Sequence, residues 1–384
     1  QWMVFSHYTE RGWTVDNLWH IFTDFYGGQY APLAFLSYLV LYAGFGYDPF
    51  YFHMFSLLLH IGCVCLVWKL ISSLLRVHGG VSEKQILYVN FITTLLFAVH
   101  PINVEAVAWI SALKVLLYAF FYLLGLLCYL RYIRTSKIFY YVLTIGCFLC
   151  SFWGKEQAVT FPLALLIVDW FTNRNMKNLE VWSEKMSFLI MAFFFGIITV
   201  LSQGKGPYEM IFPLYQRLLF GCFALVEYIT KSLLPVNLNF FYPFPIVLGE
   251  EPPLHYYLYP VVLLFLMGWI IAYRNNRYLV FGVLLFLVNL LFSIHLFNMS
   301  RHAIVADRYM YLSYVGIAFL IANGIWWLRK RLSYFKAALV FLFFYCFFLS
   351  VYTFHYTKKR ENTTMVKKYT KEVLEKRLNG SNHL

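Results

Sequence analysis

Ionisable residues lie beside or inside strongly apolar runs in three short segments, HPINVEAVAW (100–109), GKEQ (154–157) and ADRYMYL (306–312). His100 is followed after five positions by Glu105, and an imidazole near a carboxylate can transfer protons or hold a divalent ion. Lys155 and Arg308 are of the types that bind phosphate, the arginine through two parallel hydrogen bonds. A lone residue of this kind is more often a structural hydrogen-bonding group. Carboxylates combined with two cations, however, predict a site for a lipid-phosphate donor.

The elements that must position these residues are predicted to be membrane-spanning helices. The chain has 384 residues, of which 61% are hydrophobic and only 13% charged, and soluble domains do not have this composition. A helix needs about 20 apolar residues to cross the hydrocarbon core. Such runs lie near 53–75, 86–100, 113–131, 138–153, 157–171, 186–202, 256–273, 278–296, 308–328 and 334–355, and the runs at 31–46 and 216–234 are ambiguous. The predicted fold class is therefore an all-α polytopic membrane protein with about ten or eleven transmembrane helices.

The charge, the cysteines and the motifs exclude several other classes. The net charge of +13 comes from short basic clusters at the ends of apolar runs, which is typical of membrane proteins and gives no reason to expect nucleic acid. All seven cysteines lie inside apolar runs, so neither a disulfide framework nor a zinc site is indicated. The sequence contains no P-loop, no HExxH and no GxSxG motif. No cofactor follows from the residues, and a divalent metal remains an option.

The basic clusters predict which ends of the helices face the cytoplasm. By the positive-inside rule these clusters are cytoplasmic: RYIR (131–134), NRNMK (173–177), YRNNR (273–277) and LRKR (328–331). Counting crossings from them places 1–49, 100–112, 153–157, 203–215 and 297–307 on the outer side. The same count leaves no crossing for 216–234, so we expect this segment to re-enter or to lie on the outer surface. It also places the basic tail 356–384 outside.

Sorting the ionisable residues by side gathers a dozen of them on the outer face. They are Glu10, Asp16, Asp24, His100, Glu105, Lys155, Glu156, Glu227, Lys231, His302, Asp307 and Arg308. Charged groups at membrane depth are unfavourable and by default line a cavity or pair with one another. The alternative is that each is an interfacial residue whose charge reaches the headgroups. We predict that His100, Glu105, Lys155 and Glu156 line one outer-side cavity.

The chain also resembles a known family through a succession of motifs in order along nearly its whole length. These are DNLWHIFTDFYGGQYAPL (16–33), FGYDPFYFHMFSLLLH (45–60), FAVHPINVEAVAWIS (97–111), GKEQAVTFPLALLIVDW (154–170), LLPVNLNFFYP (233–243) and ADRYMYL (306–312). They resemble the membrane region of the O-mannosyltransferase-like proteins that carry tetratricopeptide repeats, in the GT-C glycosyltransferase superfamily. The resemblance implies a GT-C-like bundle with interfacial or re-entrant outer helices. It also implies transfer of a sugar from a polyprenyl phosphate to an acceptor hydroxyl on the outer side.

The sequence departs from this family at two places. The acidic pair that the family carries in its first outer loop would fall before Gln1, so the catalytic residue is expected outside this sequence. The family tends to read GRKD where this chain reads ALKV (112–115), so only Lys114 matches. The predicted substrate-binding residues are His100, Glu105, Lys114, Lys155, Glu156, Glu227, Lys231, His302, Asp307 and Arg308, and no metal ligands are assigned.

The leading hypothesis is an integral membrane glycosyltransferase whose acceptor is a protein Ser or Thr hydroxyl. A non-catalytic membrane subunit of the same fold that binds a lipid or protein is the alternative, and a transporter is less favoured because no inverted repeat is evident. The expected partners are membrane lipid, a polyprenyl-phosphate sugar and an acceptor protein, with a membrane complex as a further option. We expect an outer segment (1–49), a transmembrane domain (50–355) and a basic tail (356–384) that begins a soluble outer-side region. The expected location is a bacterial inner membrane, with the endoplasmic reticulum as second choice.

Overall fold

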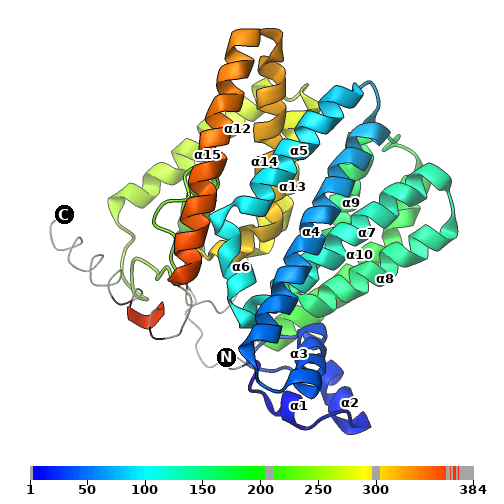
Figure 1. Cartoon of the computed structure of the whole chain (residues 1–384), viewed down its shortest axis with the longest axis vertical. Coiled ribbons are helices and arrows are strands. Elements are labelled where there is room, and N and C mark those ends of the chain that lie inside the picture. The colour runs from blue at the N-terminus through cyan, green and yellow to red at the C-terminus, as the bar shows by residue number, and fades with distance from the viewer. Residues whose placement is uncertain are drawn as a thin grey trace.

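The computed structural model describes residues 3–203, 212–295 and 303–359, with positions 364, 366–368 and 371 of the tail. Its described residues form helices and no strand beyond two isolated bridges, so the all-α fold class is confirmed (Figure 1). The longer helices are α3 (Pro32–Phe45), α4 (Pro49–His78), α5 (Glu83–Val99), α7 (Leu113–Thr135), α8 (Ile138–Gly154), α9 (Phe161–Phe171), α10 (Leu179–Gln203), α11 (Leu214–Leu233), α12 (Leu258–Ala272), α13 (Arg277–Leu290), α14 (Met310–Trp327) and α15 (Leu332–Lys358). Short elements include α1 (His7–Glu10), α2 (Val15–Thr23), α6 (Val104–Ala108) and the 3-10 helices η1 (Pro101–Asn103), η2 (Ile110–Ala112), η3 (Glu156–Thr160), η4 (Leu254–Tyr257), η5 (Leu291–Ser293), η6 (Asp307–Tyr309) and η7 (Leu328–Lys330).

Six helices in the described part of the chain are long and apolar enough to cross a membrane, which makes this an integral membrane protein. The spans are Pro49–His78, Ile110–Thr135, Leu179–Ser202, Leu254–Ala272, Asp307–Lys330 and Leu332–Lys358. A seventh arises if Glu83–Val99 and Pro101–Ala108, which meet at a bend of 49°, count as one span. Each of the ten predicted runs carries a helix, but the count of ten or eleven crossings is not confirmed.

The run at 157–171 shows why the count falls short. It is divided into η3 and α9, and α9 has only 11 residues. At 1.5 Å per residue such a helix is roughly 16 Å long, about half the thickness of the hydrocarbon core. Most of its side chains are buried among other helices, including Phe161, Leu165 and Phe171. The high hydropathy of this run therefore reflects burial inside the bundle, and hydropathy alone does not separate this case from a crossing.

Local sequence signals set several helix ends. The Ser82 hydroxyl accepts a hydrogen bond from the Gln85 amide and begins α5, which is an ordinary N-cap. Asp48 caps α4 in the same way, and Pro49 follows at the first helical position, where its missing amide hydrogen is not needed. At the other end of α7, Ser136 adopts a left-handed conformation (φ 53°) that stops the helix.

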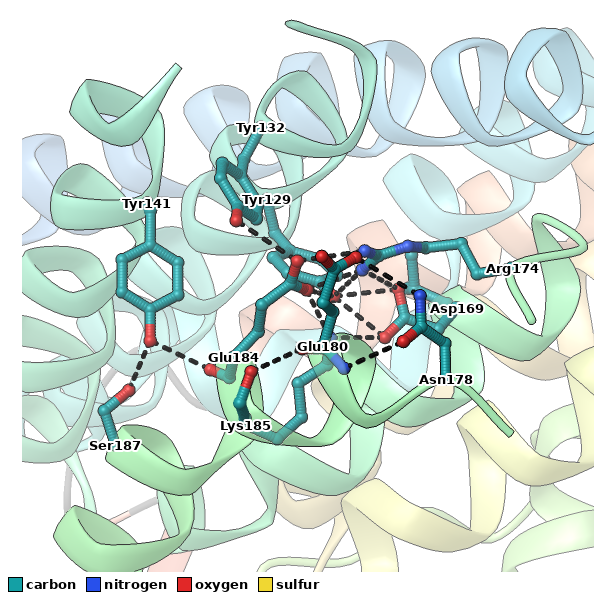
Figure 2. A network of polar contacts seen from close by, with 12 residues as sticks. Tyr129, Tyr132, Tyr141, Asp169, Arg174, Asn178, Glu180, Glu184, Lys185 and Ser187 are labelled. Atoms are coloured by element: carbon teal, nitrogen blue, oxygen red, sulfur yellow. Dashed lines mark hydrogen bonds and ion pairs between the residues drawn. The ribbon is translucent and has the colours of Figure 1, made fainter. Parts of the chain in front are cut away.

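Contacts among the basic segments place them at one end of the bundle. The Arg277 guanidinium donates to the Trp170 carbonyl at 3.0 Å and also contacts Asn173, which joins YRNNR to NRNMK. Figure 2 shows that Arg174 and Tyr132, from NRNMK and RYIR, meet at Glu184 of α10. Three of the four clusters that the positive-inside rule assigned together, RYIR, NRNMK and YRNNR, are thus neighbours in space.

Two small residues let α13 and α14 approach closely. A Cβ added at Gly316 would lie 2.5 Å from the Gly282 carbonyl oxygen and 2.8 Å from the Phe286 amide nitrogen. Small residues at helix contacts allow this approach in membrane proteins, where helices gain stability from packing rather than from exclusion of water. The pair fixes α14, which begins within the ADRYMYL segment directly after η6.

The N-terminal helices α1, α2 and α3 lie together at the end of the molecule where α4 begins (Figure 1). Asn17 ties them internally by donating to the carbonyls of Tyr8 and Gly12, both at 2.8 Å. Burial and the hydrogen bond that the Tyr8 hydroxyl donates to Asp24 raise the pKa of Tyr8. The Tyr38 hydroxyl donates to the Ile110 carbonyl at 2.9 Å and so connects this unit to the bundle beside the HPINVEAVAW segment.

Candidate functional site

The HPINVEAVAW segment folds as the bend that ends α5. His100 leaves the helical conformation, and its Nδ1 accepts a hydrogen bond from the Ile102 amide, which caps η1. Pro101 occupies the first position of η1, where no amide hydrogen is required. Asn103 donates back to the Phe97 carbonyl at 2.7 Å and closes the bend. Histidine and proline therefore serve to turn the chain into α6, which carries Glu105.

Glu105 of α6 and Arg308 of η6 form an ion pair although 203 positions separate them. The Arg308 Nη1 atom donates to Oε1 of Glu105 at 2.7 Å, and the Arg308 backbone amide donates to Oε2 at 2.9 Å. The Glu105 side chain is 0% exposed, whereas that of Arg308 is 21% exposed. Hydrogen bonds between charged groups are stronger than neutral ones, so this pair fixes η6 against α6.

Tyr309 joins the two predicted phosphate-binding cations. The Lys155 ammonium lies 4.6 Å from the centroid of the Tyr309 ring, and the Arg308 guanidinium lies 5.1 Å from the same centroid. The guanidinium is also 5.4 Å from the centroid of the Trp109 ring. Cations are attracted to aromatic faces at these distances. GKEQ and ADRYMYL, which are far apart in sequence, thus each place one cation near the Tyr309 ring.

Lys114 belongs to the same group. Its ammonium donates to the side-chain oxygen of Gln29, from the N-terminal segment, and it interacts electrostatically with Glu156 and Arg308. Lys114 is buried and Glu156 is partly buried. We define the Tyr309 cluster as Glu105, Lys114, Lys155, Glu156 and Arg308 around the Tyr309 ring. These are five of the ten residues predicted to bind substrate.

Three further predicted residues gather on the other side of η6, at Asp307. The Asp307 carboxylate accepts from the Tyr242 hydroxyl at 2.9 Å, and Lys231 of α11 lies 3.7 Å from it. Lys231 is also 3.4 Å from Glu227 and 3.4 Å from the centroid of the Tyr242 ring. This Asp307 cluster consists of Glu227, Lys231, Tyr242 and Asp307. Because its groups pair with one another, its first role is to hold η6 against α11.

His100 belongs to neither cluster as defined above. The His100 ring packs on Tyr314 of α14, with ring centroids 4.2 Å apart, and its Nδ1 caps η1. These contacts are those of a buried structural histidine. His302 lies outside the residues that the structure describes. The expected cavity shared by His100, Glu105, Lys155 and Glu156 therefore stays a prediction.

Sequence reasoning missed the aromatic and amide partners of the charged groups. Tyr309 was not among the predicted site residues, yet two cations lie within 5.1 Å of its ring centroid. Gln29 was not singled out, although it contacts Lys114. The available signal was adjacency, because Tyr309 directly follows Arg308 and Gln29 lies in the GGQ turn of a family-like motif. Within the described residues, no group of three or more His, Cys, Asp or Glu side chains is arranged to hold a metal ion.

The fold and the site define an all-helical integral membrane protein with a charged and aromatic cluster at one end of its bundle. The chain is 32% identical over 189 residues to protein O-mannosyl-transferase TMTC2 of Mus musculus, covering 45% of this chain and 21% of that protein. The human protein of the same name is 33% identical over 189 residues, with the same coverage. Protein O-mannosyl-transferase Tmtc3 of Drosophila melanogaster is 28% identical over 172 residues, covering 40% of this chain and 18% of that protein.

These relatives confirm the resemblance to the O-mannosyltransferase-like family that the motifs indicated. The chain spans about a fifth of the length of the curated relatives it matches. No family model matches the chain, and no solved structure is significantly similar to it.

Proposed function

We propose that this chain is the membrane domain of a glycosyltransferase that moves a sugar from a polyprenyl-phosphate donor to a Ser or Thr hydroxyl of a protein, on the outer side of the membrane. The observation that carries the proposal is the Tyr309 cluster, where Lys155 and Arg308 lie at one aromatic ring. Lys114 adds a third cation through its electrostatic contact with Arg308. The names of the relatives support a sugar transfer to protein.

The chemistry of the cluster suits the departure of a lipid phosphate. When the bond from the anomeric carbon to the phosphate breaks, negative charge develops on the phosphate oxygens. Lys155 and Arg308 are held in place by aromatic rings and by Glu105, so they require little rearrangement to stabilise that charge. The base that deprotonates the acceptor hydroxyl is not assigned to a residue of the Tyr309 cluster.

A non-catalytic subunit that retains the fold is the second candidate, and one observation favours it. Where the family tends to carry an arginine and an aspartate, this chain has Leu113 and Val115, and both are buried in apolar surroundings. Two polar groups of the family pattern are therefore replaced by core residues. Such a subunit would still bind a lipid phosphate at Lys155 and Arg308 but would transfer no sugar.

For the location, we favour the endoplasmic reticulum over the bacterial inner membrane that the composition suggested. The relatives come from mouse, human, frog and fly, and animal cells have no inner membrane of the bacterial kind. Both membranes would place the Tyr309 cluster on the non-cytoplasmic side. Localisation of a tagged full-length protein in its own cells decides between them.

Transfer of radiolabelled sugar in reconstituted vesicles tests the proposed activity. The complete protein that contains this chain is supplied with polyprenyl-phosphate mannose, the first donor to try given the names of the relatives, and with a Ser- and Thr-rich acceptor protein. Lys155→Gln serves as the cluster variant, and Glu83→Gln is the matched control because Glu83 forms only an exposed pair with Arg76. We expect transfer by the parent and the control and little by Lys155→Gln. Binding of the donor without transfer would support the subunit instead.

A further inference from the structure

The short helix η6 is held by two separate sets of contacts. On one side the Asp307 carboxylate accepts a hydrogen bond from the Tyr242 hydroxyl, and the Ala306 amide donates to the Tyr228 hydroxyl at 3.1 Å. On the other side the Glu105 carboxylate accepts hydrogen bonds from both the backbone amide and the guanidinium of Arg308. The backbone of η6 is therefore fixed independently of the Arg308 side chain. Glu105 is the group that fixes the side chain as well.

The two oxygens of Glu105 are both used by Arg308. Oε2 accepts from the backbone amide at 2.9 Å and Oε1 accepts from Nη1 at 2.7 Å. The Glu105 side chain is fully buried, so a donor molecule that arrives from solvent or lipid meets Arg308 and not Glu105. A guanidinium has five N–H donors in a rigid plane, so holding Nη1 on Glu105 sets the direction of all the others.

We propose that Glu105 is a positioning residue that orients the Arg308 guanidinium toward the donor phosphate and does not itself bind the donor. This inference rests on the proposed glycosyl transfer. It changes the role predicted for Glu105 from the sequence, where it counted among the substrate-binding residues. Trp109 assists by lying against the guanidinium, whose carbon is 5.4 Å from the ring centroid.

Replacing Glu105 by glutamine has two opposing effects on the donor site. Its amide group would present N–H donors to Nη1 or to the backbone amide, so the guanidinium loses its fixed direction. Removal of a negative charge beside Arg308, however, makes the site more attractive to a phosphate. Ground-state binding of the polyprenyl-phosphate sugar should therefore not weaken. Stabilisation of the departing phosphate should weaken, because it needs the guanidinium N–H groups in a fixed direction. The signature of positioning is a fall in kcat without a rise in donor KM.

A double-mutant cycle in reconstituted vesicles tests this role. The parent, Glu105→Gln, Arg308→Lys and the double variant are compared by sugar transfer at varied donor concentration, normalised to folded protein. We expect Glu105→Gln to lower kcat about tenfold to a hundredfold with donor KM unchanged or lower. In the Arg308→Lys background the same replacement should change kcat less than threefold, because the group it orients is already gone. Glu83→Gln, an exposed pair at the opposite end, is the matched control.

The possible outcomes separate this inference from the function on which it rests. Multiplicative effects of the two replacements would show that Glu105 acts independently of Arg308 and would overturn the inference. The inference would also be overturned if Glu105→Gln left kcat unchanged or raised the donor KM. The same holds if Glu105→Gln only reduced the amount of folded protein while the activity per folded molecule stayed constant. If the parent transfers no sugar from any polyprenyl-phosphate donor, the proposed function fails and the positioning role fails with it.

Discussion

A buried ion pair at the end of the bundle opposite the Tyr309 cluster leads to a stability prediction. Asp169 of α9 and Lys185 of α10 lie 2.5 Å apart, and both side chains are 0% exposed (Figure 2). The Tyr129 hydroxyl contacts both Asp169 oxygens at 2.8 Å, and Arg174 is 3.2 Å from one of them. Arg174 and Lys185 also bind Glu184. One network of hydrogen bonds and ion pairs thus connects the short helix α9 to α7, through Tyr129, and to α10, through Lys185.

The replacement Asp169→Asn leaves the hydrogen-bonding shape but removes the charge that balances Lys185. Removing one partner of a buried pair destabilises a protein by about 3–5 kcal/mol, because an uncompensated charge stays buried. Lys185 keeps Glu184 at 3.0 Å, so the lower figure applies. We expect the free energy of unfolding to fall by about 3 kcal/mol, which is roughly a hundredfold in the unfolding equilibrium. Adding Lys185→Met removes the second charge and should restore most of the loss.

Reversible unfolding in mixed detergent micelles, followed by tryptophan fluorescence, measures this difference. Glu83→Gln is the matched control, since Glu83 and Arg76 are 3.2 Å apart but 76% and 56% exposed. An exposed pair of this kind contributes about 0–1 kcal/mol. If Asp169→Asn lowers stability no more than Glu83→Gln, the network in Figure 2 does not stabilise the fold.

Three further predictions concern the donor site, the packing and the topology. Arg308→Lys should leave folding intact but lower donor efficiency about tenfold to a hundredfold, because a charge-assisted bond worth about 1.5–3 kcal/mol is lost; equal turnover would leave Arg308 as an anchor only. Gly316→Ala should lower the unfolding free energy by about 2 kcal/mol in the same micelle assay. The control Gly324→Ala, with no atom within 4 Å of the added Cβ, should not lower it, and equal losses would argue against the close approach of α13 and α14. Cysteines at the exposed positions Leu214 and Leu234, in a background without native cysteines, should both react with an impermeant maleimide from the outer side; reaction of one from the cytoplasmic side would make α11 a crossing.

Most of the helices and the grouping of their ends could be predicted from sequence, because apolar length and basic clusters are local properties. The bend at His100 and Pro101 was also visible in the sequence as a polar break between two apolar runs. The pairing of Glu105 with Arg308 was not, since it depends on how α6 and η6 meet across 203 positions. Both residues had been predicted to face the donor, and no local pattern shows that one of them holds the other.

The turn η6 separates formal charge between its two sides. On the side of the Tyr309 cluster, the three cations Lys114, Lys155 and Arg308 face the carboxylates Glu105 and Glu156, so positive charge is in excess. On the other side, within the described residues, the carboxylates of Asp307 and Glu227 pair with Lys231. We therefore expect an anionic phosphate to bind on the first side rather than on the second. Because Asp307 and Arg308 are adjacent, the carboxylate contacts that hold η6, at Asp307 on one side and at Glu105 on the other, also keep these two charge environments apart.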